Sequence, residues 1–213
     1  MKLTLYDNIS LKCSREVTTG YSTSFSLGIK MLAPRHRNAI YAIYGFVRMA
    51  DEIVDTFFDQ RQREMLDRFR ADTDDAITNR ISSNPVLHSF QWAVNTYKID
   101  REFIDAFLYS MEMDLDKKNH DQQSYTEYVY GSAEAVGLMC LRVFCHNDPG
   151  RFDHLREPAR KLGSAFQKVN FLRDIRSDYT DGGYTSLVSI LISSACPTRI
   201  LLKTISPLSS GMP

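Results

Sequence analysis

The sequence predicts an all-α protein. From Ser14 to about Asp178, apolar residues return at helical spacing, and no run alternates polar with apolar residues as a half-buried strand does. Glycine and proline fall mainly between the helical stretches. We therefore expect helices at roughly 18–31, 35–58, 60–81, 84–96, 100–116, 123–146 and 152–178.

The boundaries of these helices follow from the glycines and prolines, taken in chain order. Pro34 separates the first helix from the second, Pro85 stands at the start of the fourth, and the segment 147–150 separates the sixth from the last. Gly131 marks a break within the sixth. Gly131 and Gly137 would let that helix bend or approach a ligand, and close helix packing explains them equally well.

Bulk properties restrict the class of protein. A chain of 213 residues suits one domain, and 26 basic residues balance 26 acidic ones without clustering, which argues against a nucleic-acid partner. Its four cysteines lack any metal-ligand spacing and read as reduced thiols. No leader or membrane span is visible. We expect a cytosolic protein, and the sequence does not determine its oligomeric state. Contact with a membrane surface is plausible, but no basic amphipathic helix establishes it.

The composition changes after Asp181. Residues 182–213 hold no acidic residue, only Arg199 and Lys203 as cations, and no sustained helical or strand period. We expect a helical body at 1–181 and an irregular tail at 182–213.

The helix at 35–58 carries a polar stripe in otherwise apolar surroundings. Tyr44, Arg48, Asp51 and Asp55 follow one another at steps of four, three and four, so they share one face. Apolar residues cover much of the remaining circumference, which indicates a helix buried on several sides. The stripe is therefore expected to line a cavity.

The last helix of the body repeats this pattern. Gln167, Asn170, Asp174 and Asp178 step by three, four and four, with Arg173 beside them. Carboxylates one turn apart can share Mg²⁺, which prefers one or two carboxylates together with phosphate oxygens. A single DxxxD pattern is more often a solvated helix face, but two parallel stripes favour a site for divalent metal and diphosphate, with arginines on the phosphate oxygens.

Four ordered blocks resemble the squalene/phytoene synthases over roughly residues 14–181. They are YSTSFSLG at 21–28, AIYGFVRMADEIVD at 42–55, YVYGSAEAVGLM at 128–139 and LGSAFQKVNFLRDIRSD at 162–178. The resemblance looks closest to bacterial phytoene synthases. It implies an isoprenoid synthase-type helical bundle around a central cavity, here incomplete at the C-terminus.

The resemblance also implies roles for individual residues. Asp51, Asp55, Asp174 and Asp178 would ligate Mg²⁺, with Mn²⁺ as an alternative, and Arg48 and Arg173 would bind diphosphate. Ser22, Ser24 and Tyr44 would border the diphosphates, while Tyr128, Gln167 and Asn170 would line the reaction centre. Ser22 or Ser24 could equally cap a helix.

The implied reaction condenses two prenyl diphosphates head to head. Two geranylgeranyl diphosphates would give phytoene through a cyclopropylcarbinyl diphosphate. A squalene or dehydrosqualene synthase acting on farnesyl diphosphate is the nearest alternative, and only the squalene type would need NADPH. A non-catalytic relative is a further alternative, although the four retained aspartates argue against it.

Three smaller features have plainer interpretations. Aromatic faces stabilise carbocations, which makes Phe25, Tyr41, Tyr44 and Tyr128 candidates, but aromatic residues at helical spacing are more often core. The acidic segment at 111–121 is interpreted as a solvated helix end, and the histidines form no ligand pattern.

The segment after Asp178 departs from the family, which continues there with an arginine and a Tyr-Phe-Pro segment. One codon choice for the present Gly-Gly-Tyr-Thr-Ser-Leu, GGC GGG TAT ACT TCC CTG, read two nucleotides later, encodes Arg-Val-Tyr-Phe-Pro. We therefore expect residues from about 182 onward to be a frameshift product, and the chain as written to have low stability and little or no activity because a cavity wall is missing. The nucleotide sequence across codons 178–190 tests this expectation.

Overall fold

The computed structural model describes residues 4–57, 61–116 and 122–180, and the side chains of residues 116, 122 and 171–180 lie outside this description. Within these ranges every element is helical, which confirms the predicted fold class. The elements are α1 (Leu5–Tyr21), α2 (Thr23–Met31), α3 (Pro34–Asp55), α4 (Gln62–Asn79), α5 (Pro85–Tyr97), α6 (Arg101–Asp116), α7 (Gln122–Val129), the π-helix η1 (Tyr130–Ala135), α8 (Val136–Phe144) and α9 (Pro149–Thr180).

The N-terminal region differs from the expected single helix at 18–31. A separate helix, α1, begins at Leu5 with a capping box in which Thr4 and Asp7 satisfy each other's backbone N–H groups. Its buried residues are Ser10, Leu11, Ser14 and Thr18, and three of the four are small and polar. A helix that packs through hydroxyl-bearing side chains shows no apolar period, which is why the sequence pattern missed it.

The other expected helices agree with the structure to within a few residues at each end. The predicted break near Gly131 is real, and it takes the form of η1, a π-helical segment. A Cβ atom at Gly131 would stand 2.3 Å from the backbone oxygen of Ala106 in α6, so only glycine allows this approach. Such π-helical turns recur at functional sites because they shift the register of the side chains around them.

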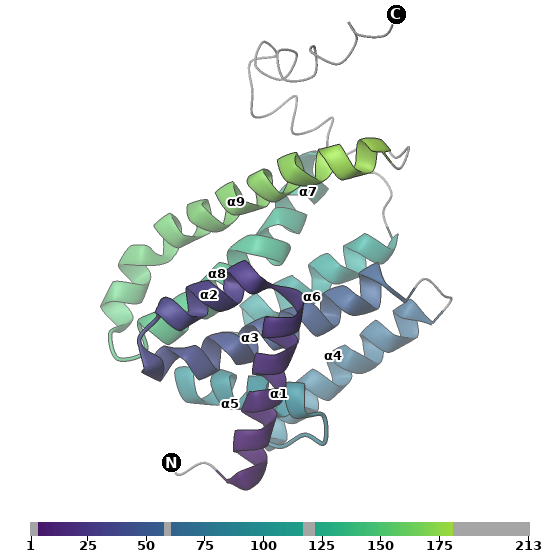
Figure 1. Ribbon diagram of the computed structural model, residues 1–213. Helices are drawn as coiled ribbons and strands as arrows, with labels where there is room; N and C mark the ends of the chain where they lie inside the picture. The colour runs from purple at the N-terminus through teal and green to yellow at the C-terminus, as the bar shows by residue number, and fades with distance from the viewer. Residues whose placement is uncertain (1–3, 58–60, 117–121, 181–213) are drawn as a thin grey trace, which may run out of the picture.

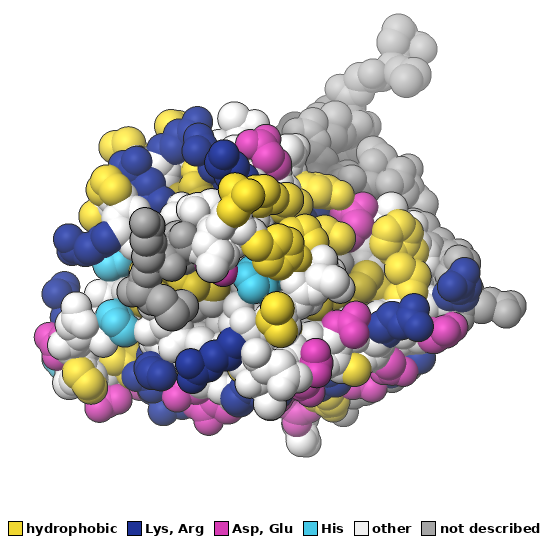
Figure 2. Space-filling model, turned by 90° about the horizontal axis from the view of Figure 1, so that it is seen from below, with side chains coloured by type: hydrophobic (Ala, Val, Ile, Leu, Met, Phe, Trp, Pro, Cys, Tyr) yellow, Lys and Arg dark blue, Asp and Glu magenta, His cyan; other side chains and the backbone are white. Residues whose placement is uncertain are grey.

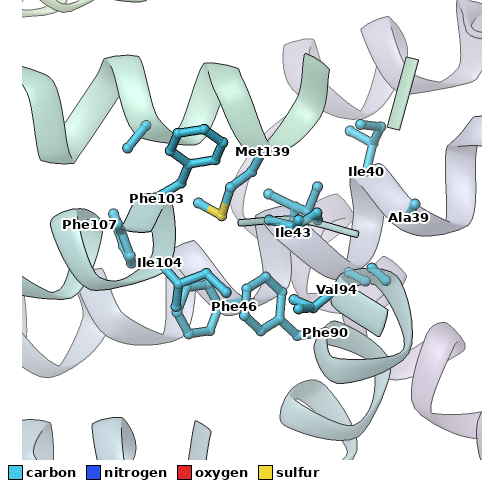
Figure 3. Packing of buried hydrophobic residues seen from close by; sticks show 14 of the residues in the cluster. Ala39, Ile40, Ile43, Phe46, Phe90, Val94, Phe103, Ile104, Phe107 and Met139 are labelled. Atoms are coloured by element: carbon cyan, nitrogen blue, oxygen red, sulfur yellow. The ribbon is translucent and has the colours of Figure 1, made fainter. Parts of the chain in front are cut away.

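The hydrophobic core lies between α3, α5, α6 and α8. Phe46 and Phe90 stack with ring centroids 3.8 Å apart, and Phe107 packs against Phe46 at 5.5 Å (Figure 3). Phe46 has no exposed surface. The helix that carries the first aspartate pair, α3, therefore lies at the centre of the core. Aromatic packing on the face opposite to the polar stripe fixes its position.

The remaining helices surround α3 on several sides (Figure 1). α1 packs across α3 and α5, α4 packs on α5, and α9 runs along the upper edge of the view in Figure 1, against η1 and α8. On the face seen in Figure 2, basic and acidic side chains are interspersed around apolar groups, so this face offers no broad basic surface. Among the described residues, no helix is long and apolar enough to cross a membrane. The expected tail at 182–213 lies outside the described residues, and its irregular character stays a prediction.

Candidate metal and diphosphate site

The first predicted stripe lies where the sequence placed it, on α3. Tyr44, Arg48 and Asp51 are partly buried, while Asp55, in the last position of the helix, is exposed. The stripe thus passes from the interior of the molecule to its surface within three turns. Ligands arriving from solvent can reach its outer end, and its inner end is shielded.

The Asp51 carboxyl shows the electrostatic cost of this position most clearly. Its pKa is raised from 3.8 to about 7, first by partial burial and then by the Asp55 carboxylate, against the opposing effect of Arg48. Burial also raises the pKa of Asp55, again against Arg48. Ionising both neighbouring carboxylates at once is therefore unfavourable, and a bound cation would make it favourable.

A third carboxylate, Asp114 in α6, joins this pair. Its pKa is raised to about 7, mainly by desolvation and also by the charges of Asp55 and Asp51, against a hydrogen bond with Tyr128 that lowers it. Asp114 nevertheless keeps an accessible surface. This combination of accessibility and desolvation is expected of a group at a concave surface, so we define Asp51, Asp55 and Asp114 as the carboxylate cluster.

Asp114 is exposed, as the interpretation of the acidic segment 111–121 as a solvated helix end expects, but its interactions with Tyr128 and the α3 aspartates also make it a candidate site residue. The signal was present in the sequence, since Phe107, Met111 and Asp114 fall on one face of α6 and the first two are buried. An aspartate that continues an apolar stripe is a candidate site residue. Residues 117–121 lie outside the described ranges.

Tyr128, at the end of α7, contacts the same cluster. Desolvation raises the pKa of its phenol, and the negative charge of Asp114 acts in the same direction. The phenol therefore keeps its proton and acts as a neutral hydrogen-bond donor to Asp114. Tyr128 is followed almost directly by η1, which connects its orientation to the close contact between Gly131 and α6.

The start of α2 closes another side of the stripe. Ser22 accepts a hydrogen bond from the backbone N–H of Phe25, so it is the N-cap of α2, and it also hydrogen-bonds Tyr44. The Phe25 ring stacks on Tyr44 with centroids 4.7 Å apart. The cap expected of Ser22 or Ser24 is therefore Ser22, while Ser24 is exposed within α2. Tyr41, by contrast, is buried in the hydrophobic core, which is the more common role of an aromatic residue at helical spacing.

The second predicted stripe lies on α9. Gln167 and Asn170 are partly buried there, and Arg173, Asp174 and Asp178 fall within the helix, although their side chains lie outside the description. α9 packs on η1 and α8, and α8 packs on α3. The position of the second aspartate pair relative to the carboxylate cluster stays a prediction.

The carboxylate cluster fits a hard divalent cation in its chemistry. Its donors are oxygen atoms only, they are crowded by like charge, and two of the three are accessible. No group of three or more His, Cys, Asp or Glu side chains in the described part of the chain, the three aspartates included, stands close enough to hold a metal ion by itself, so these side chains form no closed metal cage. Mg²⁺ does not need one, because it commonly keeps water and phosphate oxygens as ligands alongside one or two carboxylates.

Comparison with known proteins identifies the family of the chain. The family model described as squalene/phytoene synthase matches residues 18–186. The chain belongs to the squalene/phytoene synthase family. It is 34% identical over 164 residues to a presqualene diphosphate synthase of Sinorhizobium fredii, an alignment that covers 76% of this chain and 57% of the relative.

Other relatives in this family carry different names. A 4,4'-diapophytoene synthase of Staphylococcus haemolyticus is 27% identical, with 78% of this chain and 58% of the relative covered. A chloroplastic phytoene synthase of Daucus carota is 28% identical, with 78% and 43% covered. A crystal structure of a dehydrosqualene synthase in complex with ligand superimposes with a TM-score of 0.74 at 25% identity, covering 92% of this chain and 67% of that one. The chain spans about half the length of the curated relatives it matches.

Proposed function

We propose that this squalene/phytoene synthase family member takes part in joining two prenyl diphosphates head to head. The observation that carries the proposal is the carboxylate cluster, which gathers three aspartates from α3 and α6 next to Arg48 and Tyr128. Divalent metal bound there would supply the positive charge that neutralises a diphosphate leaving group. The second pair, Asp174 and Asp178, is proposed as the matching wall of the same site.

The residues of the proposed site would have different roles, which depend on the chemistry of each side chain. Arg48 would bind diphosphate oxygens, and Ser22, Ser24 and Tyr44 would border them beside the N-terminus of α2. Arg173 would bind diphosphate from α9. Tyr128, Gln167 and Asn170 would line the reaction centre, where an un-ionised phenol and amides present no strong nucleophile to a carbocation.

The favoured substrate is geranylgeranyl diphosphate, and the favoured product is phytoene, formed through a cyclopropylcarbinyl diphosphate. Phe25 and Tyr44, which stack on each other at the inner end of the stripe, are proposed to face the charged part of this reaction. The names of relatives in Staphylococcus and Sinorhizobium favour a second candidate, the condensation of farnesyl diphosphate to a squalene-type product. NADPH would be required only for reduction to squalene itself.

Binding of substrate analogues tests the site without requiring turnover. Calorimetric titration of the 213-residue chain with a non-ionisable geranylgeranyl thiodiphosphate should show Mg²⁺-dependent binding, and Asp51→Asn should weaken it about 100-fold, as loss of a metal ligand does. Asp114→Asn should weaken it about tenfold. Asp105→Asn, an exposed aspartate elsewhere on α6, is the matched control and should bind as the original chain does.

Two results would contradict the proposal. Binding that does not depend on Mg²⁺ would remove the metal role, and equal affinity in the Asp51→Asn and Asp105→Asn variants would remove the carboxylate cluster from the site. The farnesyl analogue, titrated in parallel, separates the two candidate substrates by affinity. Product formation with labelled substrates, compared between this chain and one with the frame restored after residue 181, tests the proposed frameshift.

A further inference from the structure

Glu52 lies next to Asp51 on α3, and its carboxylate pairs with Arg48 of the polar stripe. Its Oε2 accepts a hydrogen bond of 2.5 Å from Nη2 of Arg48 one turn earlier. The two side chains are only 15% and 23% exposed, respectively. Shielding from water strengthens such a pair and restricts the rotamers of the arginine, so this contact differs from an exposed helical ion pair.

Two further residues hold the same carboxylate. Tyr21 and Thr56 hydrogen-bond Glu52, and together with Arg48, the largest influence, they keep the pKa of its carboxyl below the ordinary value. The Tyr21 ring also lies under the guanidinium of Arg48, 4.4 Å from its carbon to the ring centroid. Arg48 is thus held by an edge contact to Glu52 and a face contact to Tyr21.

Tyr21 connects this pair to the start of α2. It is the last residue of α1 and directly precedes Ser22, the N-cap of α2. Ser22 hydrogen-bonds Tyr44, one turn before Arg48. The junction between α1 and α2 is therefore tied to α3 at two successive turns, and Arg48 is the charged member of that contact.

One donor of Arg48 has no acceptor. Its Nε is shielded from solvent, and no described residue hydrogen-bonds it. A shielded donor without a partner carries a desolvation cost, which a phosphate oxygen would remove. The guanidinium is consequently fixed in place while part of its hydrogen-bonding capacity is unused.

We propose that Glu52 is a positioning residue for the diphosphate subsite, holding the Arg48 guanidinium against Tyr21 so that its charge is fixed beside the start of α2. This inference rests on the proposed function, since it assumes that Arg48 binds diphosphate. An arginine already fixed by two partners loses less side-chain entropy when it binds an anion, because planar guanidinium geometry is set before the ligand arrives. Glu52 itself does not touch the ligand.

A double-mutant cycle on the full 213-residue chain tests this role. Calorimetry with inorganic pyrophosphate and Mg²⁺ should show that Arg48→Ala weakens binding about 30-fold and Glu52→Ala about tenfold. In the Arg48→Ala background, Glu52→Ala should cause no further loss, because Glu52 acts only through Arg48. Glu52→Gln keeps a hydrogen-bond acceptor for Arg48 and should lose only about threefold.

The matched control is Glu157→Ala on α9. It removes a helical Arg–Glu pair in which Glu157 accepts from Arg160 at 2.8 Å, and it should bind pyrophosphate as the original chain does. Circular dichroism melts of every variant confirm that each is folded at the titration temperature. The experiment thereby separates a positioning role from ordinary helix stabilisation, which would change the melting temperature without changing the affinity.

The failures of the two proposals are distinguishable. Undiminished binding in Arg48→Ala contradicts the proposed function of that residue. If Arg48→Ala weakens binding while Glu52→Ala matches the original chain or binds more tightly, only the positioning role of Glu52 is wrong. An equal loss from Glu52→Ala with and without Arg48 also overturns it, because the effect would then not pass through the guanidinium.

Discussion

The two helices that carry the paired aspartates, α3 and α9, differ in how the protein surrounds them. α3 packs against α1, α2, α4, α5, α6 and α8, and nine of its residues, including Phe46, are buried. α9 packs on η1 and α8, and its Leu162, Phe166 and Val169 are 59%, 62% and 60% exposed. The apolar residues that accompany the two polar stripes therefore differ in burial: those of α3 are largely covered, and these three of α9 are exposed. Burial perturbs the carboxylates of α3, so their chemistry is a property of the packing around them as much as of their spacing.

The largest expected difference between the two helices is in side-chain packing. Phe46→Ala removes a fully buried ring from the aromatic stack and should lower the free energy of unfolding by about 3–5 kcal/mol. Phe166→Ala removes an exposed ring from α9 and should change it by less than about 0.5 kcal/mol. Urea titrations measure both.

A loss of more than about 2 kcal/mol in Phe166→Ala would contradict this contrast. It would show that the outer face of α9 is covered in solution. The frameshift hypothesis adds an expectation of its own, because a chain with the restored frame should become sensitive at Phe166 if further helices pack there.

A smaller effect is expected from glycines that allow close helix contacts. A Cβ atom at Gly45 of α3 would stand 2.9 Å from Oγ of Ser14, which is buried and bonded to Ser89. A Cβ atom at Gly163 of α9 would stand 3.0 Å from the backbone oxygen of Ala133. We expect Gly45→Ala to cost about 2 kcal/mol and Gly163→Ala about 1 kcal/mol, since α9 can shift outward and α3 cannot.

Gly137→Ala is the control for these two variants. A Cβ atom there would be 3.8 Å from its nearest neighbour, an ordinary contact, so the better helix propensity of alanine should stabilise the chain by up to about 1 kcal/mol. Thermal and urea unfolding of the three variants give the order. Equal losses at Gly45 and Gly163 would mean that α9 is fixed as firmly as α3.

The smallest expected effect is the pH dependence that the α3 aspartates impart. The pKa of Asp51 is raised to about 7, so the folded chain binds its proton more tightly than the unfolded chain does. Stability is then greatest below about pH 4 for this group and is lost as the pH rises towards 7. Between pH 5 and 7.5 the melting temperature of metal-free protein should fall by about 3 °C more than that of Asp51→Asn.

Added Mg²⁺ with pyrophosphate should reverse this loss at pH 7.5, because ligands that bind only the folded state stabilise it. The same slope with pH in the original chain and in Asp51→Asn would show that this carboxyl is not perturbed. A parallel measurement on Asp174→Asn extends the comparison to α9.

Helical periodicity alone determined the fold class, the positions of most helices and the stripe on α3. These features depend on which residues lie on one face of a helix, and spacing along the chain decides that directly. The capping box at Thr4 was not predicted from the sequence, and α1 remained hidden because Ser10, Ser14 and Thr18 pack as small polar residues. Local pattern cannot distinguish a hydroxyl that meets another helix from one that meets water.

Only the tertiary structure decided which polar residues lie together. Asp114 and Tyr128 join Asp51 and Asp55 because α6 packs on α3 and α7 packs on α6. Glu52, which adjoins Asp51 in sequence, pairs with Arg48 and Tyr21. The physical reason is that the pKa of a carboxyl and the partners of an arginine depend on atoms brought near by folding, from segments far apart in the chain. The aspartate spacing determined that a charged stripe exists, and the packing around α3 determined what that stripe can bind.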